Sequence, residues 1–122
     1  MQNLTIDTGM KEYLINNRAV LRFNPGDPNL YHRFFAAAPQ LDTLDAELTE
    51  KLKALPAEPD PARAEQGLAL LNDYDRRIKA LLTEIFGEEN DFDKVLEGVN
   101  LAGTGANGKR VVQNLLDALT PI

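Results

Sequence analysis

Residues 61–87, PARAEQGLALLNDYDRRIKALLTEIFG, form the longest regular pattern in the chain. Apolar side chains recur along it at helical spacing, which predicts an amphipathic helix with one side against a core. Asp60 and Pro61 suit the N-cap and the first helical position, and Gly87 suits the stop after Phe86. The apolar stripe consists of Ala64, Leu68, Leu71, Tyr74, Ile78, Leu81, Leu82 and Ile85.

The residues upstream predict a second helix that pairs with the first. Five leucines recur there at helical spacing, and Glu47 and Lys51 lie four residues apart on the other side. Residues 56–61, PAEPDP, predict a stiff polar turn between the two helices. A short turn makes amphipathic helices antiparallel neighbours, so we expect an αα-hairpin. The leucines are Leu41, Leu44, Leu48, Leu52 and Leu55.

Another helical signal follows residues 24–26, Asn-Pro-Gly. Asp27 suits an N-cap, because its carboxylate can accept from the free N–H groups of the first turn, and Pro28 suits the first helical position. Pro39 is expected to end or bend this helix near Ala38. The apolar residues at helical spacing are Leu30, Tyr31, Phe34 and Phe35.

Residues 1–24 predict strands. Residues 4–8 alternate apolar and polar side chains, and two further segments, 12–15 and 19–23, flank Asn16 and Asn17. Asparagine tolerates a positive φ, so these two residues predict a two-residue hairpin turn. The candidate core contacts of this sheet are Tyr13, Ile15, Val20 and Phe23.

The C-terminal third predicts two more helices around a glycine-rich loop. Asp91 suits the N-cap of a short helix that contains Phe92, Val95 and Leu96 and stops at Gly98. The loop, residues 103–108, precedes a helix at about Lys109 to Leu119, and its apolar residues are Val111, Val112, Leu115, Leu116 and Leu119.

The whole chain, 1–122, is therefore expected to be one α+β domain. It would comprise a small N-terminal antiparallel sheet of two or three strands (1–24), helices with the αα-hairpin (27–86) and C-terminal helices (91–119), with four or five helices in all.

Charge and composition exclude several classes of function. The 122 residues carry 13 Lys and Arg against 19 Asp and Glu, and each half has a net charge of −3. This balance argues against binding nucleic acid or an anionic membrane. The chain has no cysteine and no apolar run long enough to span a membrane, and it begins without a signal sequence, so we expect a cytoplasmic protein. Asp73–Arg77 and Asp75–Lys79, each four residues apart, are expected on the solvent-exposed side of the 61–86 helix.

Three motifs suggest chemistry, and each has a simpler structural interpretation. Gly103–Lys109 matches two phosphate-loop patterns, but no buried strand precedes it and Arg110 stands where a magnesium-binding Ser or Thr belongs. The acidic run at 88–93 fails as a calcium loop, because Lys94 and Asn100 fall at the positions that require Gly and Glu. His32 is the only histidine and the chain has no serine. We therefore expect no enzyme activity, cofactor or metal.

Several short motifs resemble the tail assembly chaperones of long-tailed bacteriophages and prophages. At the N-terminal end they are residues 4–9, LTIDTG, and 24–28, NPGDP, followed by Arg33-Phe34. At the other end they lie within residues 92–98, FDKVLEG, then Asn107-Gly108 and residues 114–121, NLLDALTP.

The resemblance implies a non-enzymatic protein that coats the tape-measure protein, keeps it soluble and recruits tail tube subunits. It also implies self-association, so a homo-oligomer is a further expectation. Val111, Leu115 and Leu119, or the edge of the N-terminal sheet, are the expected partner contacts. Two alternatives stay open: a structural tail or head–tail joining subunit, and a nucleotide- or anion-binding protein that uses Gly103–Lys109.

Overall fold

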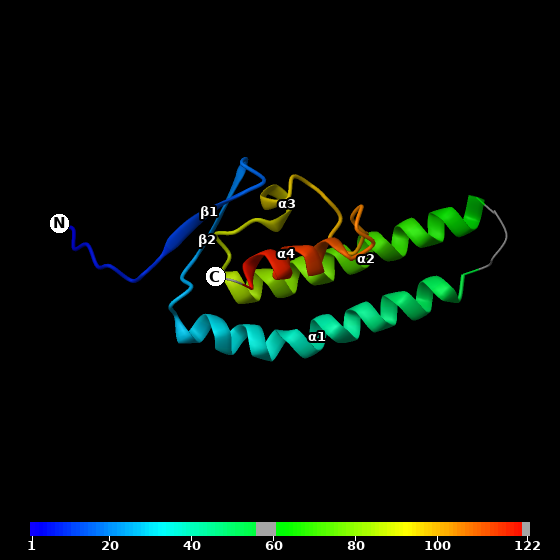
Figure 1. Ribbon diagram of the computed structural model, residues 1–122, viewed down its shortest axis with the longest axis horizontal. Helices are drawn as coiled ribbons and strands as arrows, with labels where there is room; N and C mark the ends of the chain where they lie inside the picture. Colours follow the sequence, from blue (N-terminus) through cyan, green and yellow to red (C-terminus); the bar gives the residue numbers. More distant parts are fainter. Residues whose placement is uncertain (56–60, 121–122) are drawn as a thin grey trace.

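Two helices of 26 residues each, α1 (Pro28–Lys53) and α2 (Pro61–Phe86), lie side by side and antiparallel (Figure 1). The structure is a computed structural model that describes residues 1–55 and 61–120. The αα-hairpin is thereby confirmed, while the predicted turn over 56–60 and the N-cap at Asp60 lie outside the described residues. Among the described residues, no helix combines the length and apolar character needed to cross a membrane.

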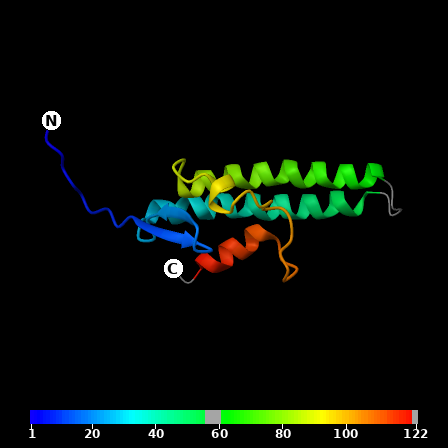
Figure 2. The same ribbon diagram turned by 90° about the horizontal axis from the view of Figure 1, so that it is seen from above.

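The remaining elements gather at one end of this hairpin (Figures 1 and 2). The described chain thus has a two-stranded sheet followed by four helices, which confirms the α+β class. These elements are β1 (Lys11–Ile15), β2 (Ala19–Phe23), α3 (Phe92–Val95) and α4 (Val111–Leu119).

Local capping chemistry sets three helix ends as predicted, whereas α3 ends at Val95, before the predicted Leu96. Asp27 has an extended backbone, and its Oδ1 accepts from the Asn29 N–H at 2.9 Å, with Pro28 as the first helical residue. Gly87 follows α2 with a φ of +103°, the left-handed conformation in which glycine ends helices. Asp91 caps α3 through the N–H of Asp93.

Pro39 bends α1 rather than ending it, so of the two predicted outcomes the bend is the one observed, and residues 28–53 form one helix rather than two. The helix continues through Pro39 to Lys53 and bends near its middle in Figure 1. Proline removes one backbone hydrogen bond and crowds the preceding turn, which bends a helix without necessarily ending it. Packing along α2 on both sides of this position holds the two halves together.

The hairpin turn forms where predicted. Asn16 and Asn17 have φ values of +52° and +62°, and the Arg18 N–H donates to the Ile15 oxygen at 3.1 Å. Ile15 pairs with Ala19, so the connection contains three residues rather than the expected two.

Val20 was expected in the core of the sheet, and that prediction is wrong. Leu21 and Phe23 are buried, and Tyr13 and Ile15 are half-buried against the same core. Val20 is 47% exposed. Successive strand residues point to opposite faces, so Val20 cannot share a face with Phe23.

The expected strand over residues 4–8 is also wrong. Residues 1–10 have no regular secondary structure, and Leu4 and Ile6 are 82% and 75% exposed. Alternation of side chains is a necessary property of a half-buried strand, but a strand also needs a hydrogen-bonding neighbour, and the described chain offers this segment none.

Asp75 and Lys79 lie inside the fold rather than on the solvent-exposed side of α2, contrary to the prediction. The Lys79 ammonium lies 2.8 Å from the Asp75 carboxylate and 2.6 Å from that of Asp93. Asp75 also accepts from the Leu101 N–H at 2.7 Å. Burial alone would lower the pKa of Lys79, but the two carboxylates outweigh it and raise the pKa above its ordinary value. Asp73–Arg77 does form a surface ion pair, at 2.9 Å.

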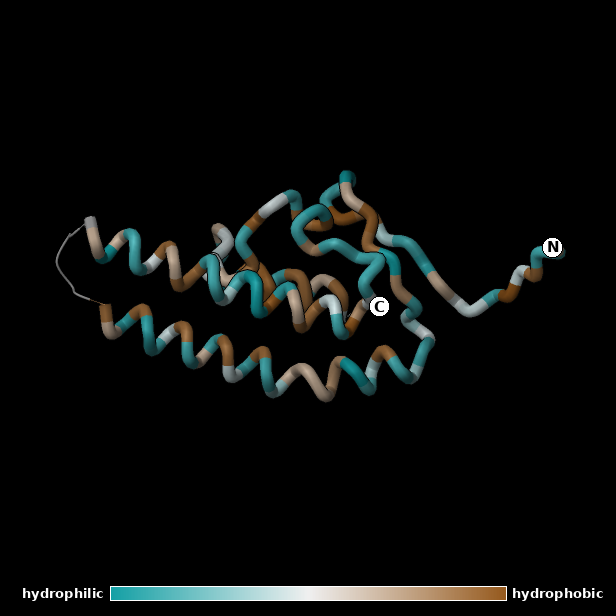
Figure 3. Tube along the Cα trace, turned by 180° about the vertical axis from the view of Figure 1, so that it is seen from behind, coloured by the Kyte–Doolittle hydropathy of each residue, from teal (hydrophilic) through white to brown (hydrophobic). Residues whose placement is uncertain are grey.

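A single apolar core joins these elements where the sheet, α3 and α4 meet the hairpin. Figure 3 shows hydrophobic segments facing each other across the two long helices. The α2 stripe is buried from Tyr74 onwards, whereas Leu68, in the half of α2 remote from the sheet, is 67% exposed. The largest fully buried residues are Tyr74, Phe92, Leu21, Leu48, Leu82, Ile85 and Leu101.

Candidate functional site

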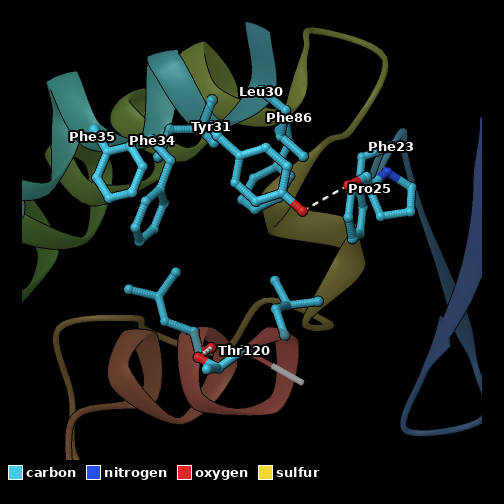
Figure 4. A pocket seen from close by; sticks show the side chains of 11 residues that line it. Phe23, Pro25, Leu30, Tyr31, Phe34, Phe35, Phe86 and Thr120 are labelled. Atoms are coloured by element: carbon cyan, nitrogen blue, oxygen red, sulfur yellow. Dashed lines mark hydrogen bonds between the residues drawn. The ribbon is translucent and has the colours of Figure 1, made fainter. Parts of the chain in front are cut away.

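An apolar groove of about 250 Å³ lies between the first turns of α1 and the last turn of α4 (Figure 4). This volume is below the roughly 300–1,000 Å³ of small-molecule pockets, and the groove lacks a set of convergent polar groups, so it suits apolar side chains better than a cofactor. It is lined by Leu30, Tyr31, Phe34 and Phe35 of α1, Phe23 at the end of β2, Pro25 between β2 and α1, Ile85 and Phe86 of α2, and Leu116, Leu119 and Thr120 at the end of α4.

Two rows of side chains on α1 form one wall of this groove. Leu30 and Phe34 are four residues apart and turn inward, with Leu30 buried and Phe34 half-buried. Tyr31 and Phe35, also four apart, form the exposed rim, and Phe35 is 70% exposed. The Tyr31 hydroxyl donates to the Pro25 oxygen at 2.6 Å, which fixes that ring at the end of the groove.

Stacked aromatic rings support the groove from behind. The rings of Tyr13 and Phe23 stack with centroids 5.0 Å apart, Phe23 meets Phe86 edge-on at 5.3 Å, and Phe86 contacts Phe92 at 5.9 Å. Such ring pairs pack with defined geometry. The wall behind the rim is therefore pre-formed.

The predicted contact residues on α4 mostly pack against the fold itself. Leu115 is buried, and Val111 and Leu119 are half-buried against the core. Of these three, Leu119 alone lines the groove. Their role as partner contacts stays a prediction, and in this structure their common role is to hold α4 on the hairpin.

The sequence offered a signal for the rim that the prediction did not use. Tyr31 and Phe35 belong to the same predicted apolar set as Leu30 and Phe34. Together these four large side chains form a stripe that is wider than the nine-residue α4 covers, so Tyr31 and Phe35 stay exposed.

Beyond Phe34, the space between α1 and α4 becomes polar, and both of its cations are paired. Arg110 bonds the Asp45 carboxylate, the Thr49 hydroxyl at 2.9 Å and the Ala102 oxygen at 2.7 Å. Lys109 lies 3.4 Å from Asp117. A hydrogen bond from the Gln113 amide, together with Lys109, lowers the pKa of Asp117. The bonds from Arg110 to Asp45 and Thr49 attach the start of α4 to α1, whereas Lys109, Gln113 and Asp117 bond each other along α4.

The glycine-rich loop uses its backbone N–H groups internally. The N–H of Gly105 donates to the Lys109 oxygen at 2.8 Å, and that of Gly108 donates to the Gly105 oxygen at 3.0 Å. At the start of α4, the N–H of Val111 donates to Gly103 and that of Val112 to Leu101. The helix therefore begins two residues later than predicted, and the N–H groups of Gly105, Gly108, Val111 and Val112 are already bonded within the chain rather than open to a phosphate.

The acidic run and the single histidine occupy separate structural positions. Asp91 caps α3, Asp93 pairs with Lys79, and Glu89 and His32 are exposed. Within residues 1–55 and 61–120, no group of three or more His, Cys, Asp or Glu residues is placed to hold a metal ion.

Comparison with known proteins gave no match to a family model, a curated protein or a solved structure.

Proposed function

We propose that this chain is a non-enzymatic assembly chaperone that binds an apolar helix of its partner in the groove between α1 and α4. The observation that carries the proposal is the exposed aromatic rim, Tyr31 and Phe35, above a pre-formed apolar wall. A groove of this kind binds the apolar face of an amphipathic helix, whose anchors recur every three or four residues. Burying one large side chain contributes about 1.5–3 kcal/mol.

The resemblance to tail assembly chaperones of long-tailed phages and prophages supplies the partner class. A tape-measure protein is a long helical protein with apolar surface to shield, and tail tube subunits are the second expected partner. Exposed Tyr and Phe side chains are the residue types that gather in the centre of protein interfaces.

The charged groups beside the groove support a binding role over a catalytic one. Arg110 is bonded to Asp45 and Thr49, and Lys109 lies beside Asp117. The Arg110 bonds hold α4 against α1, the Lys109–Asp117 pair lies along α4, and none of these groups lines the apolar groove.

Co-expression tests this proposal directly. The chain would be produced together with the proteins encoded immediately beside it, and the soluble, co-purifying fraction of each would be measured. We expect the tape-measure protein to be soluble only when the chain is present. Failure to solubilise or bind any neighbour contradicts the proposal. Retention of the chain in purified mature particles identifies a structural tail or head–tail joining subunit instead.

A further inference from the structure

Residues 1–10 form an arm that extends away from the rest of the molecule (Figure 2). The arm alternates apolar and polar residues, with Leu4 and Ile6 on one side and Thr5 and Asp7 on the other. Figure 3 shows hydrophobic segments along it that face no other part of the chain. A sequence with strand periodicity thus lies exposed and unpaired.

The base of the arm is held so that it leads away from its own sheet. The Asn24 amide donates to the Thr8 oxygen, and the Gly9 N–H donates to the Asp7 carboxylate at 2.9 Å. Gly9 has a φ of +85°, and a Cβ there would lie 3.0 Å from the Asn24 Oδ1. These contacts favour an arm that projects outward over one that folds back as a third strand.

The two edges of the sheet differ. On β2, Asn90 occupies the outer edge by bonding both the N–H and the C=O of Arg22. Arg22 faces Glu12 across the sheet. In an antiparallel pair, the backbone groups of two facing residues either both point toward the partner strand or both point away from it. Those of Arg22 point away from β1, toward Asn90. The backbone groups of Glu12, and of Leu14 two residues on, therefore point outward from β1. Nothing in residues 1–55 and 61–120 is bonded to them.

The outer face of the sheet carries one exposed apolar pair beside the Glu12–Arg22 ion pair. Leu14 pairs with Val20 across the strands, and both side chains are exposed. A strand added to β1 would place its own apolar side chains beside this pair. A two-stranded sheet is marginal, and a third strand is the usual remedy.

We propose that the arm of a second copy of this chain pairs with the outer edge of β1, and that the exchange is reciprocal. Leu4 and Ile6 of one copy would then lie beside Leu14 of the other, on the face that also carries Val20. Residues 1–7, which precede the base of the arm, would span about 23 Å if extended, at roughly 3.3 Å per residue. That length is enough to cover the five residues of β1. A reciprocal exchange forms a closed two-fold dimer.

Sedimentation of the full chain tests the exchange, together with amide hydrogen exchange followed by NMR. We expect a dimer at micromolar concentration in which the Glu12 and Leu14 N–H groups are protected. Ile6→Asp should weaken dimerisation by about tenfold or more and remove that protection. Leu68→Asp, a matched change at an equally exposed apolar residue, should alter neither.

A monomer at high micromolar concentration overturns the proposal. So does a dimer in which the Glu12 and Leu14 N–H groups exchange rapidly, because that dimer uses another surface. Leu14→Pro offers a second test, since it removes an outward N–H without removing a bond between β1 and β2, and it should abolish the dimer while circular dichroism stays helical. The readout involves no tail protein, so it is independent of the chaperone proposal.

Discussion

The side-chain amide of Asn90 forms two hydrogen bonds with the backbone of Arg22. Its Oδ1 accepts from the Arg22 N–H at 2.8 Å and its Nδ2 donates to the Arg22 oxygen at 2.7 Å. The same Nδ2 donates to the Phe86 oxygen at 3.0 Å, at the end of α2. One buried asparagine thus takes the place of a third strand beside β2 and joins the sheet to the end of α2.

Asn90→Ala should lower the free energy of unfolding by about 2–3 kcal/mol, because it leaves the partly buried backbone groups of Arg22 and the buried Phe86 oxygen without partners. Urea denaturation measures the change. Asn107→Ala is the matched control, because Asn107 bonds Asn114 at an exposed site and its loss should cost under about 1 kcal/mol. Equal effects of the two variants would contradict the role given to Asn90.

Lys79→Met should lower the free energy of unfolding by about 2 kcal/mol at neutral pH, because Asp75 loses its cation while remaining buried. The raised pKa of Lys79 gives the pH dependence its sign. The stabilisation by the charged Lys79 is complete at pH values below its ordinary pKa of 10.5. It is lost as the pH rises through the higher pKa that Lys79 has in the folded state.

The gap in stability between the wild type and Lys79→Met should therefore be constant from neutral pH to about pH 10 and narrow above it. Denaturation at a series of pH values measures this gap. Lys53→Met, which removes an exposed pair with Glu50 at 3.7 Å, should cost under about 0.5 kcal/mol at every pH. A gap that grows at high pH would show that Lys79 does not stabilise the fold as a cation.

Features determined by neighbouring residues could be predicted from the sequence. The cap at Asp27, the stop at Gly87 and the turn at Asn16–Asn17 depend on the backbone conformations and side-chain bonds of a few adjacent residues. The hairpin of α1 and α2 likewise follows from two apolar stripes and a short connection.

Features that depend on partners distant in the sequence could not be predicted. Asp75 and Lys79 have the spacing of a surface pair, and their burial depends on Asp93 and on the Leu101 N–H, 26 residues along the chain. The strand periodicity of the arm carried no information on whether a neighbouring strand exists. The groove likewise depends on how far α4 reaches along α1, which no local pattern specifies.

Pro39→Ala should raise the free energy of unfolding by about 1–3 kcal/mol, because Pro39 lies exposed inside α1 where alanine restores a backbone hydrogen bond. Thermal and urea denaturation measure it. Pro28→Ala, at the first helical position, should change stability little. A loss of stability in Pro39→Ala would mean that packing requires the bend.

ATP, GTP and NAD should leave the melting temperature unchanged, because the Gly105 and Gly108 N–H groups are bonded within the loop. A site that bound any of them would raise the melting temperature progressively with ligand concentration. Thermal denaturation over a ligand titration decides this, and a saturable increase would restore the nucleotide-binding alternative.

The most direct test of the aromatic groove compares Phe35→Glu with Leu68→Glu in co-expression with the tape-measure protein. Both changes place a charge at an apolar residue of similar exposure, one on the groove rim and the other on the remote half of α2. With both variants folded by circular dichroism, we predict that Phe35→Glu loses the co-purifying tape-measure protein and Leu68→Glu retains it. Undiminished co-purification with Phe35→Glu would contradict the account.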